Sequence, residues 1–110
     1  APAAEDENDL SKMEMDLHLL EVYTRGSLET ATNLTEEEIK ALPMGAYTMT
    51  LEVATRFLKD YLDGDAYFKV QYPEHNLVRA RTQIKLVADM EKKMDEMNAI
   101  VERVAAEIRK

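Results

Sequence analysis

The most constraining feature of this sequence is a stripe of apolar residues that runs through its last third. Its members follow one another at steps of three or four residues: Leu77, Ala80, Ile84, Val87, Met90, Met94, Met97, Val101, Val104 and Ile108. This spacing keeps them on one face of an α-helix. The stripe predicts one amphipathic helix, capped by Asn76 and reaching Lys110, about 50 Å long. No other segment is long enough to cover such a helix, so we expect it to need a partner, either a larger protein or a second copy.

Two more helices are predicted in the first part of the chain. One starts near Leu10 and ends at Asn33-Leu34, and Gly26 within it indicates a close backbone approach or a local break. Thr35, with a glutamate three residues later at Glu38, forms the pattern of a capping box. It predicts a short helix that ends near residue 42, because the following proline disfavours helical geometry in its predecessor.

A third long helix is predicted from Pro43 to Asp63, with Gly64 as the residue that ends it. The apolar stripe that should face the core comprises Met44, Tyr47, Leu51, Ala54, Leu58 and Tyr61. The segment 65–75 contains the only strand-like residues and is broken by a proline. We therefore predict an all-α fold, a helical bundle of three long helices and one short helix, in which the C-terminal helix is the longest.

The composition limits the classes of function. With 45% apolar and 33% charged residues among 110, the chain is typical of one globular domain, which we place at residues 10–110, after an acidic irregular arm at 1–9. A net charge of -8 disfavours binding to nucleic acid or to a membrane surface. The chain has no cysteine, no apolar run long enough to span a bilayer and no signal-peptide pattern, which favours a cytoplasmic location.

The usual catalytic and metal-binding motifs are not apparent in the sequence. His18 and His75 lack the spacing of metal ligands. Asp60, Asp63 and Asp65 loosely suggest calcium but miss the spacing of an EF-hand loop, and solvated acids at a helix end are the favoured interpretation. Neither a glycine-rich phosphate loop nor a nucleophile–base pair is evident, so we predict no catalytic residue and no metal site.

Several cations and one tyrosine remain as candidate binding residues. Arg79, Arg81 and Lys85 lie in the first turns of the long helix, where cations oppose the helix dipole. They indicate either ion pairs with carboxylates of another helix, which we favour, or a bound anion. Arg56 allows the same two interpretations, and Tyr67 could stack on a sugar or cover the core.

Five segments of the chain carry a resemblance to a known family: residues 4–10, 42–46, 56–65, 67–69 and 75–83. They resemble the C-terminal part of the N-acetylhexosamine 1-kinases, in the aminoglycoside phosphotransferase and choline kinase-like superfamily. The resemblance extends from about Ala4 to Val101. It implies that Arg56 and Tyr67 contact the acceptor sugar, Arg56 by hydrogen bonds and Tyr67 by packing on the ring. At Met94 the sequence departs from the family, which often has a tryptophan there.

The resemblance also implies that catalysis and ATP binding belong to parts of the enzyme outside the matched region. In that family the catalytic loop, the metal-binding aspartate and the ATP-binding lobe all precede the matched region, so ATP and Mg²⁺ belong to parts that this sequence does not contain. Phosphoryl transfer requires all of them. We therefore expect an excised or engineered substrate-side subdomain of a transferase that is inactive alone and keeps weak N-acetylhexosamine binding or none. We expect the chain to form a homodimer through apolar helix faces. The alternative function is an engineered helical scaffold, or a self-associating or partner-binding protein, without a small-molecule ligand.

Overall fold

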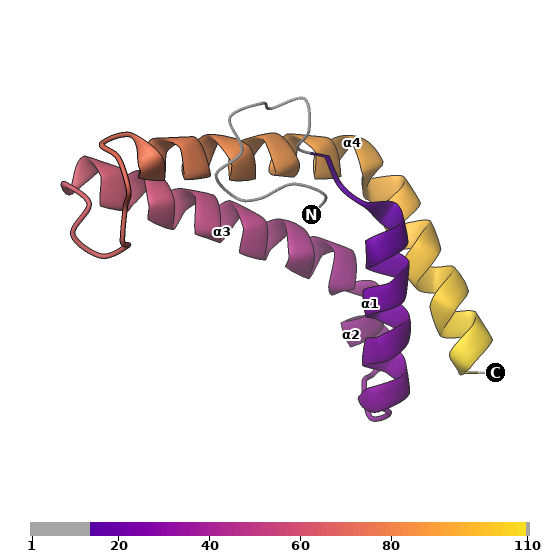
Figure 1. The fold of residues 1–110 in the computed structure, drawn as a ribbon. Helices are drawn as coiled ribbons and strands as arrows, with labels where there is room; N and C mark the ends of the chain where they lie inside the picture. Colours follow the sequence, from indigo (N-terminus) through magenta and orange to yellow (C-terminus); the bar gives the residue numbers. More distant parts are fainter. Residues whose placement is uncertain (1–13, 110) are drawn as a thin grey trace.

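The computed structural model describes residues 14–109, and within them the fold is all-α, as predicted. Four helices follow one another: α1 (Leu17–Thr30), α2 (Glu36–Lys40), α3 (Leu42–Leu62) and α4 (His75–Ile108). Figure 1 shows α3 antiparallel to the first half of α4, while α1 lies along the second half, beyond a bend in α4. The molecule is elongated, with extents of 52 × 27 × 18 Å. The predicted arm at 1–9 lies outside the described residues.

The other helices together cover the long helix α4 along its length. The prediction that the rest of the chain is too short to cover it is therefore wrong. Near its middle, Leu86, Met90 and Met97 pack with Leu20 of α1 in one apolar cluster. A second cluster towards its end comprises Leu28, Ile39, Val101 and Val104, from α1, α2 and α4. The prediction failed because three shorter helices share the length of α4, so no single helix has to match it.

Helix α1 begins at Leu17, later than predicted from its apolar spacing. The carboxylate of Asp16 accepts a hydrogen bond from the Leu19 N–H at 3.0 Å and caps the helix. The backbone just before it is held by α4, because Met15 N–H donates to Asp89 and Met15 C=O accepts from Lys93 at 3.1 Å. These tertiary bonds engage the two backbone groups with which residue 15 would otherwise continue the helix, whereas the Asp16 C=O accepts from the Leu20 N–H at 3.1 Å.

Gly26 lies inside the continuous helix α1, and neither predicted role for it holds. A Cβ placed on Gly26 would meet nothing within 4 Å, so no backbone approaches it closely. The helix is not broken there either.

The short helix α2 confirms the predicted capping box. Thr35 Oγ1 accepts from the Glu38 N–H at 3.1 Å, and the Glu38 carboxylate accepts from the Thr35 N–H at 3.0 Å. The pKa of Glu38 is lowered, first by the hydrogen bond from the Thr35 backbone and then by its side chain. Both bonds are local in sequence, which is why the residues alone predict them.

Helix α3 forms almost where it was predicted, but only one side of its predicted stripe faces the core. Ala54 of that stripe is buried and Tyr47 and Tyr61 are partly buried, whereas Met44, Leu51 and Leu58 are 54%, 43% and 37% exposed. The other buried residues of α3, Pro43, Phe57 and Asp60, lie outside the predicted stripe. Phe57 is in contact with the following loop and with α4, and this packing outweighs the longer run of aliphatic residues on the other face.

Helix α4 starts at His75, with Glu74 rather than Asn76 at the N-cap position. Asn76 is fully buried and serves a tertiary role described below. Ile84, predicted on the buried stripe, is half exposed.

Within residues 14–109, no helix is long and apolar enough to cross a membrane.

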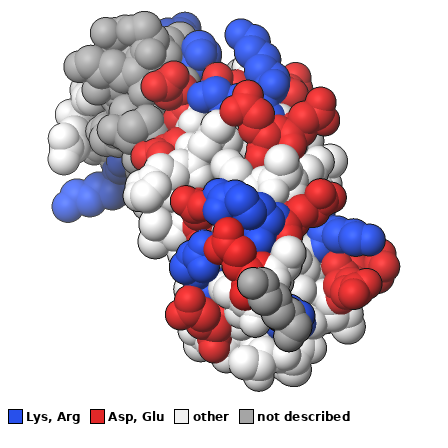
Figure 2. All heavy atoms as spheres, turned by 90° about the vertical axis from the view of Figure 1, so that its right-hand side faces the viewer, with Lys and Arg blue, Asp and Glu red and all other residues white. Residues whose placement is uncertain are grey.

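Ion pairs join α1 to the second half of α4. Arg25 lies 2.6 Å from Glu107, and Arg103 pairs with both Glu21 and Glu107. Figure 2 shows basic and acidic side chains interspersed over this face. The hydrogen bonds from Arg25 and Arg103 lower the pKa of Glu107. Their side chains are 26% to 50% exposed, so these pairs contribute modestly to stability, and Arg25–Glu107 and Arg103–Glu21 mainly fix how α1 lies against α4.

Candidate functional site

The end of the α3–α4 hairpin holds Arg56 and Tyr67, the two residues that the resemblance assigns to the sugar. Helix α3 ends in a Schellman motif: Gly64 N–H donates to Tyr61 C=O at 3.2 Å, and Asp65 N–H donates to Asp60 C=O at 2.8 Å. Gly64 and Asp65 both have positive φ, 88° and 61°. This reverses the chain at Gly64, as predicted, and begins the loop that leads to α4.

Asp60 is the centre of the interactions that hold this loop. Its carboxylate accepts hydrogen bonds from Tyr67 N–H at 2.7 Å, Phe68 N–H at 3.0 Å and the Asn76 amide at 2.7 Å. Burial acts to raise the pKa of Asp60, but the hydrogen bonds from the backbone of Phe68 and Tyr67 and from Asn76 together lower it below its usual value. Asp60 therefore acts as a buried acceptor that ties the loop to α3.

Asn76 and Arg79 extend this network along α4. The Asn76 amide also donates to Asp65 at 3.1 Å, and its oxygen accepts from Arg79 at 3.0 Å. Arg79 donates in addition to Lys69 C=O at 3.0 Å, and its guanidinium lies 5.5 Å from the centre of the Phe57 ring. Arg79 is thus a structural residue that joins the loop to both helices.

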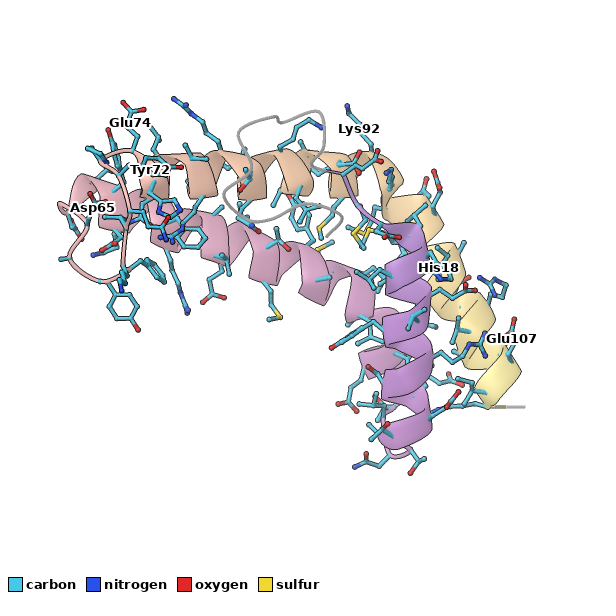
Figure 3. All side chains as sticks on the ribbon, viewed as in Figure 1. His18, Asp65, Tyr72, Glu74, Lys92 and Glu107 are labelled. Carbon is cyan, nitrogen blue, oxygen red and sulfur yellow. The ribbon has the colours of Figure 1, made fainter. Side chains whose placement is uncertain are left out.

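Aromatic contacts complete the support of the loop. The Phe57 and Phe68 ring centres are 4.8 Å apart, and Tyr67 meets Phe68 edge-on at 5.0 Å. At the other end of the loop, Tyr72 stacks on His75 at 4.6 Å, and Gln71 N–H donates to His75 Nδ1 at 3.2 Å. Asp65 and Tyr72 lie at this end of the hairpin in Figure 3, away from His18 on α1.

A shallow hollow of about 300 Å³ lies between α3 and the loop. It is lined by Arg56, Lys59, Asp60, Asp63, Ala66, Tyr67 and Phe68. Its rim carries two cations in exposed ion pairs with carboxylates, Arg56 with Glu52 at 2.7 Å and Lys59 with Asp63 at 2.6 Å. The hydrogen bond to Asp63 is the main cause that raises the pKa of Lys59. The Tyr67 ring is 84% exposed at the edge of the hollow.

The structure brings together two of the predicted site residues and separates the other three. Arg56 and Tyr67 line the same hollow. Arg79 points into the loop network, Arg81 is exposed on α4, and Lys85 lies near Asp89, whose pKa its charge helps to lower. Arg81 and Lys85 are four residues apart and share a face of α4, but Arg79 lies two and six residues from them and faces another direction, so the three do not converge on one point.

Sequence reasoning missed Asp60 and Asn76 as partners. Asp60 was considered only as a helix-end acid, and Asn76 only as an N-cap. One signal for Asp60 was available, since it lies three residues after Phe57, on the same side of the helix. No comparable signal marked Asn76, because its two carboxylate partners come from α3 and from the loop that follows it.

The carboxylates near the hollow are already engaged, and they do not fit a metal or an ATP–Mg²⁺ complex. Asp60 binds three donors of the loop and α4, Asp63 pairs with Lys59, and Asp65 accepts from Asn76. Among residues 14–109, no group of three acids or histidines is arranged to hold a metal ion.

The groups of the hollow suit a neutral, hydroxyl-rich ligand. Guanidinium and ammonium groups donate to hydroxyl and amide oxygens, and an exposed tyrosine ring offers a flat apolar surface. A comparison of the chain with known protein families finds no match.

Proposed function

We propose that this chain is the acceptor-sugar-binding helical part of an N-acetylhexosamine 1-kinase-like phosphotransferase. The observation that supports this most directly is that Arg56 and Tyr67, the two residues that the family resemblance assigns to the sugar, line one hollow. Eleven positions separate them in sequence. The Asp60 network brings them together by fixing the loop that carries Tyr67 against the helix that carries Arg56.

In this proposal the hollow binds the sugar and takes no part in the chemistry of transfer. Arg56 donates to the acetamido oxygen or a ring hydroxyl, and Tyr67 packs against the sugar ring. The hollow is shallow and open, so binding by this chain alone is weak. Transfer of a phosphoryl group would use the catalytic loop and the ATP-binding lobe that the resemblance places ahead of the matched region.

Titration with N-acetylglucosamine and N-acetylgalactosamine, followed by backbone amide chemical shifts, tests the proposal. We expect millimolar affinity, with shifts confined to residues 56–68, and a loss of saturation in Arg56→Ala and Tyr67→Leu. Arg81→Ala is the matched control, because it removes an exposed cation from α4 outside the hollow. Unchanged spectra up to high millimolar sugar would refute the proposal, and so would equal effects of all three substitutions.

The alternative function is a helical scaffold or self-associating protein without a small-molecule ligand. It is favoured by the apolar residues that α3 exposes to solvent. The same sugar titration separates the two, because a scaffold predicts no localised shifts. Formation of a sugar 1-phosphate by this chain alone, in the presence of ATP, would contradict both.

A further inference from the structure

The outer face of α3 carries an exposed apolar stripe that the fold does not use. Met44, Leu51, Leu58 and Leu62 are 54%, 43%, 37% and 74% exposed. Together with Thr48 and Thr55, which are also exposed, they follow one another at steps of four, three, four, three and four residues. This is the spacing of one seam of a coiled coil, and it extends over about 27 Å. We call these six residues the α3 stripe.

The α3 stripe is distinct from the face that α3 packs against α4. The buried residues of α3 are Pro43, Ala54, Phe57 and Asp60, which lie on another side of the helix. Four of the six residues of the α3 stripe are large and apolar, and folded proteins seldom line up exposed apolar residues in this way unless they bind something. The stripe has the length and spacing that suit another helix with the same repeat.

We propose that the α3 stripe binds the α3 stripe of a second copy of this chain, with the two helices antiparallel. In this register each threonine or methionine lies beside a leucine: Met44 beside Leu62, Thr48 beside Leu58, and Leu51 beside Thr55 of the second copy. The arrangement is two-fold symmetric, so every contact occurs twice and the same surface serves both chains.

Charge complementarity favours this partner and this orientation. Glu52 and Lys59 border the stripe on the same side, seven residues apart. In the antiparallel register, residues on this side face their own equivalents in the second copy, which sets Glu52 of each chain opposite Lys59 of the other. A parallel pair would instead set these charges opposite Tyr47, Ala54 and Tyr61, the side of the stripe next to α4.

The present partners of these two charges do not prevent the exchange. Glu52 pairs with Arg56 and Lys59 with Asp63, and every side chain involved is more than half exposed. Exposed pairs of this kind contribute little to stability, so they can rearrange when a second chain binds. Because the stripe is narrow, we expect a weak dimer that forms in the micromolar range.

Sedimentation equilibrium over a series of micromolar concentrations tests the interface. We expect a monomer–dimer equilibrium that Leu51→Glu with Leu58→Glu abolishes, while circular dichroism stays helical because both positions are exposed. The matched control is Leu19→Glu, which places the same charge at a half-exposed leucine of α1 and should leave the dimer intact. A monomer at every concentration would overturn the proposal, as would a dimer that survives the α3 substitutions.

Charge reversal tests the register. Glu52→Lys and Lys59→Glu each place like charges opposite each other in a homodimer, and we expect each to weaken it about tenfold. An equimolar mixture of the two variants restores both oppositely charged pairs, so it should dimerise as strongly as the original chain. If mixing gives no recovery, the antiparallel register is wrong. If the dimer or its register is refuted, the sugar proposal is unaffected, because the hollow includes no residue of the α3 stripe. Sugar binding can be titrated separately in the monomeric Leu51→Glu, Leu58→Glu variant.

Discussion

Replacing Asn76 by aspartate tests whether the hairpin end is held as the structure indicates. The substitution keeps the shape of the side chain but exchanges its amide, which lies 2.7 Å from Asp60 and 3.1 Å from Asp65, for a third carboxyl group. Residue 76 is fully buried, so solvent cannot relieve the repulsion. Two ionised carboxylates 2.7 Å apart would repel by about 6 kcal/mol at an effective dielectric constant of about 20.

Keeping the new carboxyl group protonated costs less than ionising it beside Asp60. The cost of protonation therefore determines how much stability Asn76→Asp loses. A protonated carboxyl can donate to Asp60 as the amide does. Holding it protonated at about pH 7, roughly three units above its usual pKa, costs about 4 kcal/mol. The neighbouring Arg79, which stabilises the charged form, reduces this cost somewhat. We expect Asn76→Asp to lower the free energy of unfolding by about 3 to 4 kcal/mol at neutral pH.

The free energy of unfolding of Asn76→Asp should depend on pH. Folding raises the pKa of the carboxyl group that the substitution introduces. The contribution of this group to stability is therefore present below the pKa that it has in the unfolded state and is lost as pH rises. The deficit should therefore shrink by about 1.4 kcal/mol per pH unit between about pH 7 and pH 4. Asp60 of the original chain behaves oppositely: its pKa is lowered on folding, so its contribution is present above the usual value and is lost as pH falls. The two stability curves should converge on acidification.

Urea unfolding followed by far-UV circular dichroism at several pH values measures the effect. Asn98→Asp is the matched control, because it makes the same change at an exposed position of α4 and should stay within about 0.5 kcal/mol. Hydrogen exchange at the Tyr67 and Phe68 amides would show whether the loop opens first. If Asn76→Asp is as stable as the original chain at neutral pH, or its deficit does not shrink in acid, the buried Asp60–Asn76 contact is refuted.

Three further substitutions have definite expected results. Thr24→Val should raise the free energy of unfolding by about 1 kcal/mol, because the buried Thr24 hydroxyl has no hydrogen-bond partner, and a lower melting temperature would contradict this. Thr35→Ala should lower the free energy of unfolding by about 1 kcal/mol through loss of the capping box, whereas Thr35→Ser should retain most of that stabilisation. Equal melting temperatures of the two variants would show that the cap contributes nothing. Gly64→Ala should cost about 1 kcal/mol although space for a Cβ is open, because φ is +88°, and a neutral result in urea unfolding would argue against the left-handed turn.

The sequence by itself determined where the helices form and how several of them end. The capping box at Thr35, the break before Pro43 and the reversal at Gly64 all depend on groups within five residues of one another. Interactions this close in sequence need no contact between helices, so they can be predicted unless a tertiary bond takes one of the groups, as happens to Asn76. The long apolar repeat of α4 likewise required a helix, whatever packed against it.

Only the tertiary structure decided which faces turn inward and which polar groups pair. The apolar side chains of α3 occupy more than one face, and periodicity could not tell which would meet α4. The choice depends on Phe57, Phe68 and Arg79, which come from three different elements. The candidate site shows the same division. The resemblance marked Arg56 and Tyr67, but the hollow between them exists because Asp60 and Asn76, sixteen residues apart, meet in the interior. Such contacts depend on how whole helices pack, which local spacing does not encode.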